Sequence, residues 1–323
     1  MVGVLQKRRA LRAASLAIQG LLLCLLLSGL GCRTLRTRRQ TQALSDARQN
    51  SLRGAEKLQQ NKLKDAEFLF SEALRRSTAD ERAHWGMAEV LWQQGERGRA
   101  IEHMVRAAAI SGENPDLLVR LGEMNLQEGY LDQALVQADA ALQSQRHHAG
   151  AWALRGQVLH KRQQFEPAMD CYHRALINQP NSPHVQEALA ELYHALGRPQ
   201  RALATLDYMT DGQPEEKISA KTWMLKGQAL ADLGESAAAK NCLRNAALCA
   251  ADDDMDLLLA LVESQIATGD LAEARVCLGR AFRHDPQNPT ALRMQNTLQH
   301  SFHQSTTPGN LVGFGQSPSA GFP

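Results

Sequence analysis

The sequence has few aromatic residues and lacks the short motifs that hold cofactors or catalytic groups. Phenylalanine, tryptophan and tyrosine make up 5% of its 323 residues, which is low for the core of a globular enzyme. It contains no Gly-rich phosphate-binding loop, no His-Glu-x-x-His pair and no nucleophile elbow. We therefore expect neither an enzyme nor a cofactor.

The six cysteines include no Cys-x-x-Cys pair, so the sequence predicts neither a zinc site nor a redox motif. Cys24 and Cys32 lie in or directly after an apolar N-terminal stretch. We expect the other four to be small buried side chains; they are Cys171, Cys242, Cys249 and Cys277.

Acidic residues outnumber basic ones in the body of the chain. Residues 1–40 hold eight of the 36 lysines and arginines and none of the 34 acidic residues, so residues 41–323 carry a net charge of −6. A surface that binds nucleic acid needs clustered lysine and arginine. We expect no nucleic-acid partner.

The N-terminus has the order of an export signal. A basic segment, Lys7 to Arg12, precedes the uncharged residues 13–30, and small residues follow before Cys32. The end of this segment resembles a bacterial lipoprotein signal, in which the cysteine is lipidated and becomes the first mature residue. That resemblance implies lipidation at Cys32 and a place in the bacterial cell envelope.

Two alternatives to lipidation stay open. About 18 apolar residues can just span a bilayer, so the segment could remain as an uncleaved membrane anchor. Plain cleavage would instead give a periplasmic or secreted protein. All three place the body of the chain beside a membrane or across it.

The body repeats with a period of about 34 residues. Alanine recurs at Ala66, Ala100, Ala134, Ala168 and Ala202, each 34 residues after the last, and then at Ala239 and Ala274, after 37 and 35. Five residues before each alanine stand Asn61, Gly95, Gly129, Gln163, Gly197, Gly234 and Gly269, which predicts a turn between two helices. Small residues twelve before the alanine, such as Gly54, Gly122 and Gly156, would let the two helices approach closely.

This pattern resembles the tetratricopeptide repeat family over about residues 47–288, in seven copies. The resemblance implies an all-α fold, a right-handed superhelical solenoid of helix–turn–helix repeats. We expect residues 1–32 to be the signal or anchor, residues 33–46 a linker, and residues 47–300 the solenoid, with a capping helix over Asn288–Gln299. Residues 301–323, rich in Ser, Thr, Pro and Gly, predict a disordered tail.

Family members usually bind partner peptides on the concave side, which the first helices line. One position there reads Ala55, Glu89, Glu123, Gln157, Glu191, Gln228 and Glu263. This row predicts an acidic, hydrogen-bonding groove for basic or amide-rich segments, or simply a polar solvent-facing position. Trp85 and Trp92, seven residues apart, could anchor a partner if exposed or belong to the core if buried. His160 and His194 share an equivalent position, and we expect ordinary surface histidines rather than a metal site. The ten residues that we expect to line the partner-binding groove are Trp85, Glu89, Trp92, Glu123, Gln157, His160, Glu191, His194, Gln228 and Glu263.

The expected function is a non-catalytic scaffold that binds other proteins at a membrane. An export segment joined to repeats alone is a layout similar to that of the pilotin family, which helps an envelope secretin assemble. We consider that a narrower alternative. A catalytic remnant in the short tail, or a cytosolic regulator with a misread start, fits the sequence less well.

Overall fold

The computed structural model describes residues 42–306, and every regular element within them is a helix. The expected export segment, Cys32 and residues 307–323 of the expected tail lie outside these residues. In the described part of the chain, no helix is both long enough and apolar enough to cross a membrane. The all-α fold predicted from the repeat spacing is confirmed.

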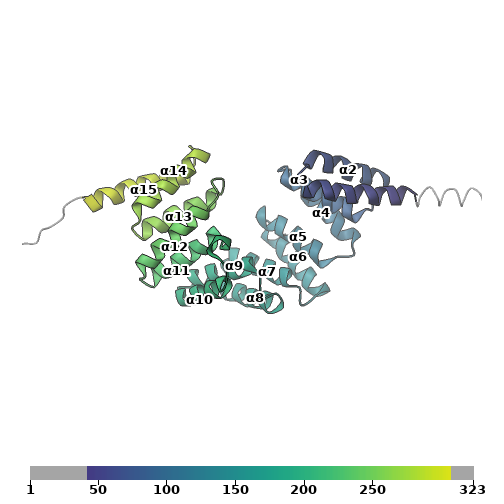
Figure 1. The fold of residues 1–323 in the computed structure, drawn as a ribbon. Helices are drawn as coiled ribbons and strands as arrows, with labels where there is room; N and C mark the ends of the chain where they lie inside the picture. Colours follow the sequence, from purple (N-terminus) through teal and green to yellow (C-terminus); the bar gives the residue numbers. More distant parts are fainter. Residues whose placement is uncertain (1–41, 307–323) are drawn as a thin grey trace, which may run out of the picture. The chain divides into compact units, whose positions relative to one another are not determined.

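The chain divides into two compact units, residues 1–154 and 155–323. The described part of the first unit begins with a helix at residues 42–59. Its other helices are α2 (Leu63–Arg76), α3 (Glu81–Gln93), α4 (Arg97–Ile110), α5 (Pro115–Gln127), α6 (Leu131–Ser144) and the start of α7 (Ala149–Lys161). From α2 to α6, each helix packs against the next, and Figure 1 shows their order.

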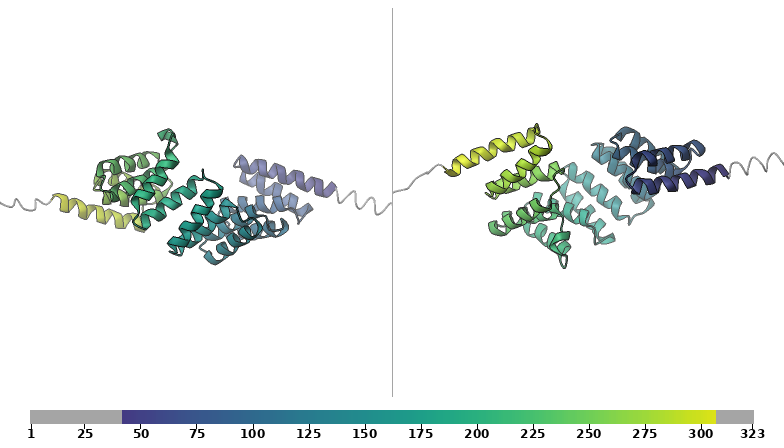
Figure 2. Two further views of the ribbon diagram at one scale, coloured as in Figure 1. Left: turned by 90° about the horizontal axis from the view of Figure 1, so that it is seen from below. Right: turned by 45° about the horizontal axis from the view of Figure 1, so that its top comes forward.

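The second unit continues from Arg155 in α7. It contains α8 (Phe165–Asn178), α9 (Pro183–Ala195), α10 (Pro199–Thr210), the short 3-10 helix η1 (Glu215–Lys217), α11 (Ala220–Asp232), α12 (Ser236–Cys249), α13 (Met255–Ala267), α14 (Leu271–His284) and α15 (Pro289–Thr306). Figure 2 gives two further views of these helices. Helix η1 occupies the longer connection after the fifth repeat, where the alanine spacing is 37 residues.

The seven predicted turn positions all have the left-handed backbone. Their φ angles lie between 56° and 85°, and Asn61 and Gln163 adopt this conformation without being glycine. A residue with positive φ ends a helix and lets the next one start antiparallel to it. The turn prediction is therefore confirmed in every repeat.

The predicted alanine and small-residue positions form the contact between the paired helices. All seven repeat alanines are at most 1% exposed. A Cβ atom placed on Gly156 of α7 would lie 2.6 Å from Cε1 of Tyr172 on α8. Glycine is needed there because the aromatic ring of Tyr172 fills the space that a side chain would take.

Helical structure extends beyond two of the expected boundaries. The first described helix already includes residues 42–46 of the expected linker, and α15 continues to Thr306. Neither stretch contains the Gly or Pro residues that would end a helix. The expected capping helix is present as α15, which packs on α13 and α14 and buries Ala291 and Leu298.

Candidate protein-binding surface

Two hollows lie on the first helices of successive repeats in the second unit. The larger, which we call the α9 groove, measures about 570 Å³ and is lined by residues that include Gln157, His160, Tyr172, Glu187, Glu191 and Lys221. The smaller, the α13 hollow, measures about 250 Å³ and is lined by residues that include His194, Gln228, Asp232, Glu263 and Ser264. Six of the ten groove residues expected from the sequence therefore line one of the two.

The α9 groove takes its walls from α7, α8, α9 and α11. Glu191 on α9 forms an ion pair with Lys221 on α11, Oε1 to Nζ, at 2.9 Å. Burial lowers the pKa of His160. The charges of Lys161 and Lys221 also lower this pKa, whereas the charge of Glu191 raises it. His160 is thus held neutral near pH 7, with its ring edge-on to Phe165.

Glu187, one turn before Glu191 on α9, is the groove residue that sequence reasoning missed. It is only 6% exposed, and two hydroxyl groups donate to its Oε1, from Ser219 at 2.7 Å and Thr222 at 2.6 Å. Ser219 is the N-cap of α11, where its Oγ accepts from the Thr222 amide. Glu187 therefore ties α9 to the start of the next first helix.

A signal for Glu187 was present in the sequence. It stands fifteen residues before the repeat alanine, where the other repeats have Ser51, Trp85, Val119, Ala153, Met224 and Leu259. A carboxylate at a position that is otherwise mostly apolar indicates a buried polar interaction or a binding role.

The α13 hollow is lined by polar groups that bind one another across repeats. The Gln228 amide on α11 donates to Ser264 Oγ on α13 at 2.8 Å, and that hydroxyl donates to the Ala260 carbonyl. His194 Nδ1 lies 2.7 Å from Asp232 Oδ2. Glu263 is exposed.

In the first unit a single arginine, Arg120, partly neutralises the expected acidic row. Arg120 on α5 binds both carboxylate oxygens of Glu89 on α3, at 2.7 and 2.8 Å, and also Glu123 at 3.2 Å. The hydrogen bonds to Glu89 raise the pKa of Arg120 further. Together with the Glu191–Lys221 pair, this means that three of the four predicted glutamates already have a cation.

The two tryptophans of α3 do not form one exposed face. Trp92 is 9% exposed and belongs to the core, and the Arg97 guanidinium lies 4.0 Å from its ring centroid. Trp85 is 44% exposed, and its Nε1 donates to Glu89 at 3.3 Å. A seven-residue spacing puts both on one side of the helix, but Trp92 lies near the inter-helix turn, where α4 and α5 cover it.

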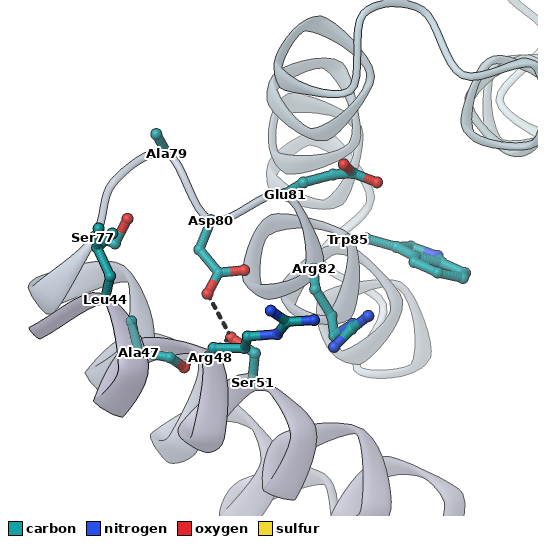
Figure 3. A pocket seen from close by; sticks show the side chains of 10 residues that line it. All are labelled: Leu44, Ala47, Arg48, Ser51, Ser77, Ala79, Asp80, Glu81, Arg82 and Trp85. Atoms are coloured by element: carbon teal, nitrogen blue, oxygen red, sulfur yellow. Dashed lines mark hydrogen bonds between the residues drawn. The ribbon is translucent and has the colours of Figure 1, made fainter. Parts of the chain in front are cut away.

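Trp85 borders a third hollow of about 410 Å³, between residues 44–51 and the start of α3. Figure 3 shows the Ser51–Asp80 hydrogen bond, 2.8 Å long, with Trp85 pointing away from it. Asp80 also caps α3 by accepting from the Ala83 amide. These carboxylate contacts join the first helix to the second repeat.

The cysteines divide by burial. Cys171 and Cys277 are buried as expected, Cys242 is half-buried, and Cys249 is exposed, against expectation, at the last position of α12. Within residues 42–306, no group of three His, Cys, Asp or Glu side chains is arranged to hold a metal ion.

Comparison with known proteins agrees with this geometry. Family models described as tetratricopeptide repeat match residues 52–115, 183–207, 220–248 and 255–280. No curated protein sequence matches the chain significantly.

Several solved structures have a similar fold at low sequence identity. A tetratricopeptide repeat protein from Parabacteroides merdae has a TM-score of 0.64 and 14% identity, covering 79% of this chain and 99% of its own. Pseudomonas aeruginosa PilF has a TM-score of 0.55 and 18% identity, and the match covers 62% of this chain and 90% of PilF. PilW is described as a widely conserved type IV pilus biogenesis factor. It has a TM-score of 0.56 and 19% identity, and the match covers 61% of this chain and 90% of PilW.

Proposed function

The chain is a tetratricopeptide repeat protein, and we propose that it binds segments of other proteins along the first helices of its second unit, α7, α9, α11 and α13. The fold supports a protein–protein interaction scaffold with protein partners. The observation that carries the proposed location is the pair of hollows on these helices, which together hold six of the residues expected to line a groove. Their mixed polar and apolar walls suit an extended peptide.

We propose a scaffold rather than an enzyme because the hydroxyls of the α13 hollow are not activated. Ser264 Oγ donates to the Ala260 carbonyl, and Thr268 Oγ1 donates to the carbonyls of Ser264 and Gln265. A nucleophilic hydroxyl instead needs a base within hydrogen-bond reach. The hydroxyls of Ser264 and Thr268 donate to main-chain carbonyls instead, and we therefore propose that the hollow is a binding surface.

Site-specific photo-crosslinking tests the location. A benzophenone amino acid would replace Gln157 in the α9 groove or Gln228 in the α13 hollow, and the matched control would replace Asp170, an exposed residue on the second helix α8. We expect adducts with the same partner from the two groove positions and none from the control. Equal adducts from Asp170 would contradict the proposed face.

We further propose that the N-terminus holds the protein at the bacterial envelope through a lipid on Cys32. Support comes from the order of basic, apolar and small residues before that cysteine. Labelling with a palmitate analogue should mark the wild type and Cys249→Ala, and should fail in Cys32→Ala. Label retained by Cys32→Ala would exclude Cys32 as the lipidated residue, and absence of label from the wild type would favour an uncleaved anchor or a secreted protein.

A narrower candidate is a part in type IV pilus or secretin assembly. It is favoured by the lipoprotein-like N-terminus combined with a fold similar to PilF and PilW. Deletion of the gene in its host, followed by measurement of surface pili and of secretin multimers, tests it. Unchanged levels of both would remove this candidate and leave the general scaffold role in place.

A further inference from the structure

We propose that Glu187 is the residue of the α9 groove that binds a lysine or arginine side chain of the partner segment. This inference rests on the proposed function and deepens it, because it names the chemistry that one subsite recognises. Only 6% of the surface of Glu187 is exposed, but the residue lines the groove together with Tyr172 and Glu191.

The hydrogen bonds of Glu187 leave half of its carboxylate available. Both hydroxyl donors, Ser219 and Thr222, bind the same oxygen, Oε1. Within residues 42–306, no hydrogen bond or ion pair engages Oε2. Oε2 is not fully buried, so a carboxylate fixed at one oxygen and open to solvent at the other is a preoriented acceptor.

Glu187 also differs from Glu191 and Glu89 in lacking a cation. Glu191 is paired with Lys221, and Glu89 with Arg120, whereas in the described part of the chain no lysine, arginine or histidine lies within ion-pair distance of Glu187. Buried charges in proteins are normally paired, because desolvation of a lone ion is costly. In the unbound protein, the partial positive charge at the N-terminus of α11 stabilises Glu187 only in part.

The surroundings of Glu187 suit a long cationic side chain. Phe165, which is only half-buried, supplies an aromatic wall for the methylene groups of a lysine or arginine. His160 is neutral because burial lowers its pKa, so it does not repel a cation. The charge of Lys221 is taken up by Glu191, and the other lysine of the groove, Lys161, is exposed to solvent.

Peptide selection on the full-length protein tests this chemistry. A displayed library of random nonapeptides would be selected against the wild type, against Glu187→Gln, and against the control Asp170→Asn, which removes an exposed carboxylate on α8. We expect the wild type and the control to select peptides with one fixed basic position, and Glu187→Gln to lose that preference. Ser219→Ala, which removes the hydroxyl that donates to Glu187 and caps α11 but removes no charge, should keep it.

Affinity and crosslinking then locate the contact. Norleucine in place of the fixed lysine should weaken binding to the wild type by about tenfold or more, as expected for a desolvated charge pair, and binding to Glu187→Gln by less than about twofold. Carbodiimide coupling of the peptide lysine to the wild-type protein should give an amide bond on Glu187 by mass spectrometry. This last measurement needs no variant, so it stays decisive if Glu187→Gln fails to fold.

The possible outcomes distinguish a failure of the role proposed for Glu187 from a failure of the proposed peptide-binding function. Peptides that bind the α9 groove without a fixed basic residue, or whose lysine couples to Glu191 instead, overturn the role of Glu187 and leave peptide binding intact. If no peptide is selected by the wild type, the proposed binding face fails and the inference fails with it.

Discussion

Replacement of Gly156 by alanine should destabilise the second unit, although alanine is the better helix former. An added Cβ would lie 2.6 and 2.7 Å from Cε1 and Cδ1 of Tyr172 and 3.2 Å from its Cζ. Tyr172 is 1% exposed, so its ring cannot move aside into solvent. Either the ring or the α7–α8 spacing has to shift.

The expected size follows from two opposing effects. An extra carbon in a well-packed core costs about 1–3 kcal/mol, whereas replacing glycine by alanine inside a helix contributes up to about 1 kcal/mol of stability. Since two ring atoms lie below 3 Å from the new carbon, we expect overpacking to dominate. The free energy of unfolding should fall by about 1–2 kcal/mol.

Urea unfolding followed by far-UV circular dichroism measures this change, with Gly279→Ala as the matched control. Gly279 lies inside α14, and a Cβ there would meet no atom within 4 Å. The control should be as stable as the wild type or more stable. In a Tyr172→Leu background, Gly156→Ala should cost less than it does alone. Gly156→Ala at wild-type stability would refute the close-contact argument.

Three further changes test electrostatic and hydrogen-bonding features of the fold by urea unfolding. The Nδ1 atoms of His103 and His84 lie 3.0 Å apart, and burial lowers the pKa of His103 to about 4. Below pH 6.5 the unfolded chain therefore binds a proton more readily than the folded one. The free energy of unfolding should fall by about 1–2 kcal/mol, allowing for solvent access, as the pH drops from 6.5 towards 4. The same pH dependence in His103→Gln would contradict this. Arg120→Ala should cost about 1 kcal/mol, because Glu89 loses its cation, and a cost that 1 M salt leaves unchanged would exclude a charge effect. Arg280→Ala should cost about 1–3 kcal/mol, because Arg280 donates to two main-chain carbonyls at the end of α12; wild-type stability would show that water replaces these bonds.

The repeat architecture could be predicted from spacing because each repeat position makes one kind of contact. Alanine at the helix crossing, a left-handed residue at the turn and a residue, small in most repeats, where the paired helices approach are local requirements, and the chain meets them again every 34 to 37 residues. Boundaries were harder to place. Residues 42–46 and 301–306 are helical, but they lie outside the repeat period, so periodicity carries no information about them.

The candidate site was only partly predictable because its chemistry depends on pairs between repeats. Spacing placed Glu89 and Glu191 on the first helices, but it could not show that Arg120 and Lys221, from the next first helix in each case, bind them. Likewise, spacing put Trp92 on the same side of α3 as Trp85, but it could not show that the Arg97 guanidinium covers the Trp92 ring. Such contacts depend on side-chain direction and on the packing of neighbouring helices.

These pairs change what an acidic row can do for a partner. A basic segment that approaches Glu191 has to displace Lys221, so one exposed ion pair replaces another and the gain in free energy is small. At Glu187 the partner displaces no protein cation, and its charge would pair with a carboxylate that is already mostly buried and held in place by two hydroxyls. Selectivity for a cation in the α9 groove is therefore expected to depend on the burial of one carboxylate. On this argument, neutralising Glu191 should change binding of a basic peptide less than neutralising Glu187, even though Glu191 is the more exposed and the more easily predicted of the two.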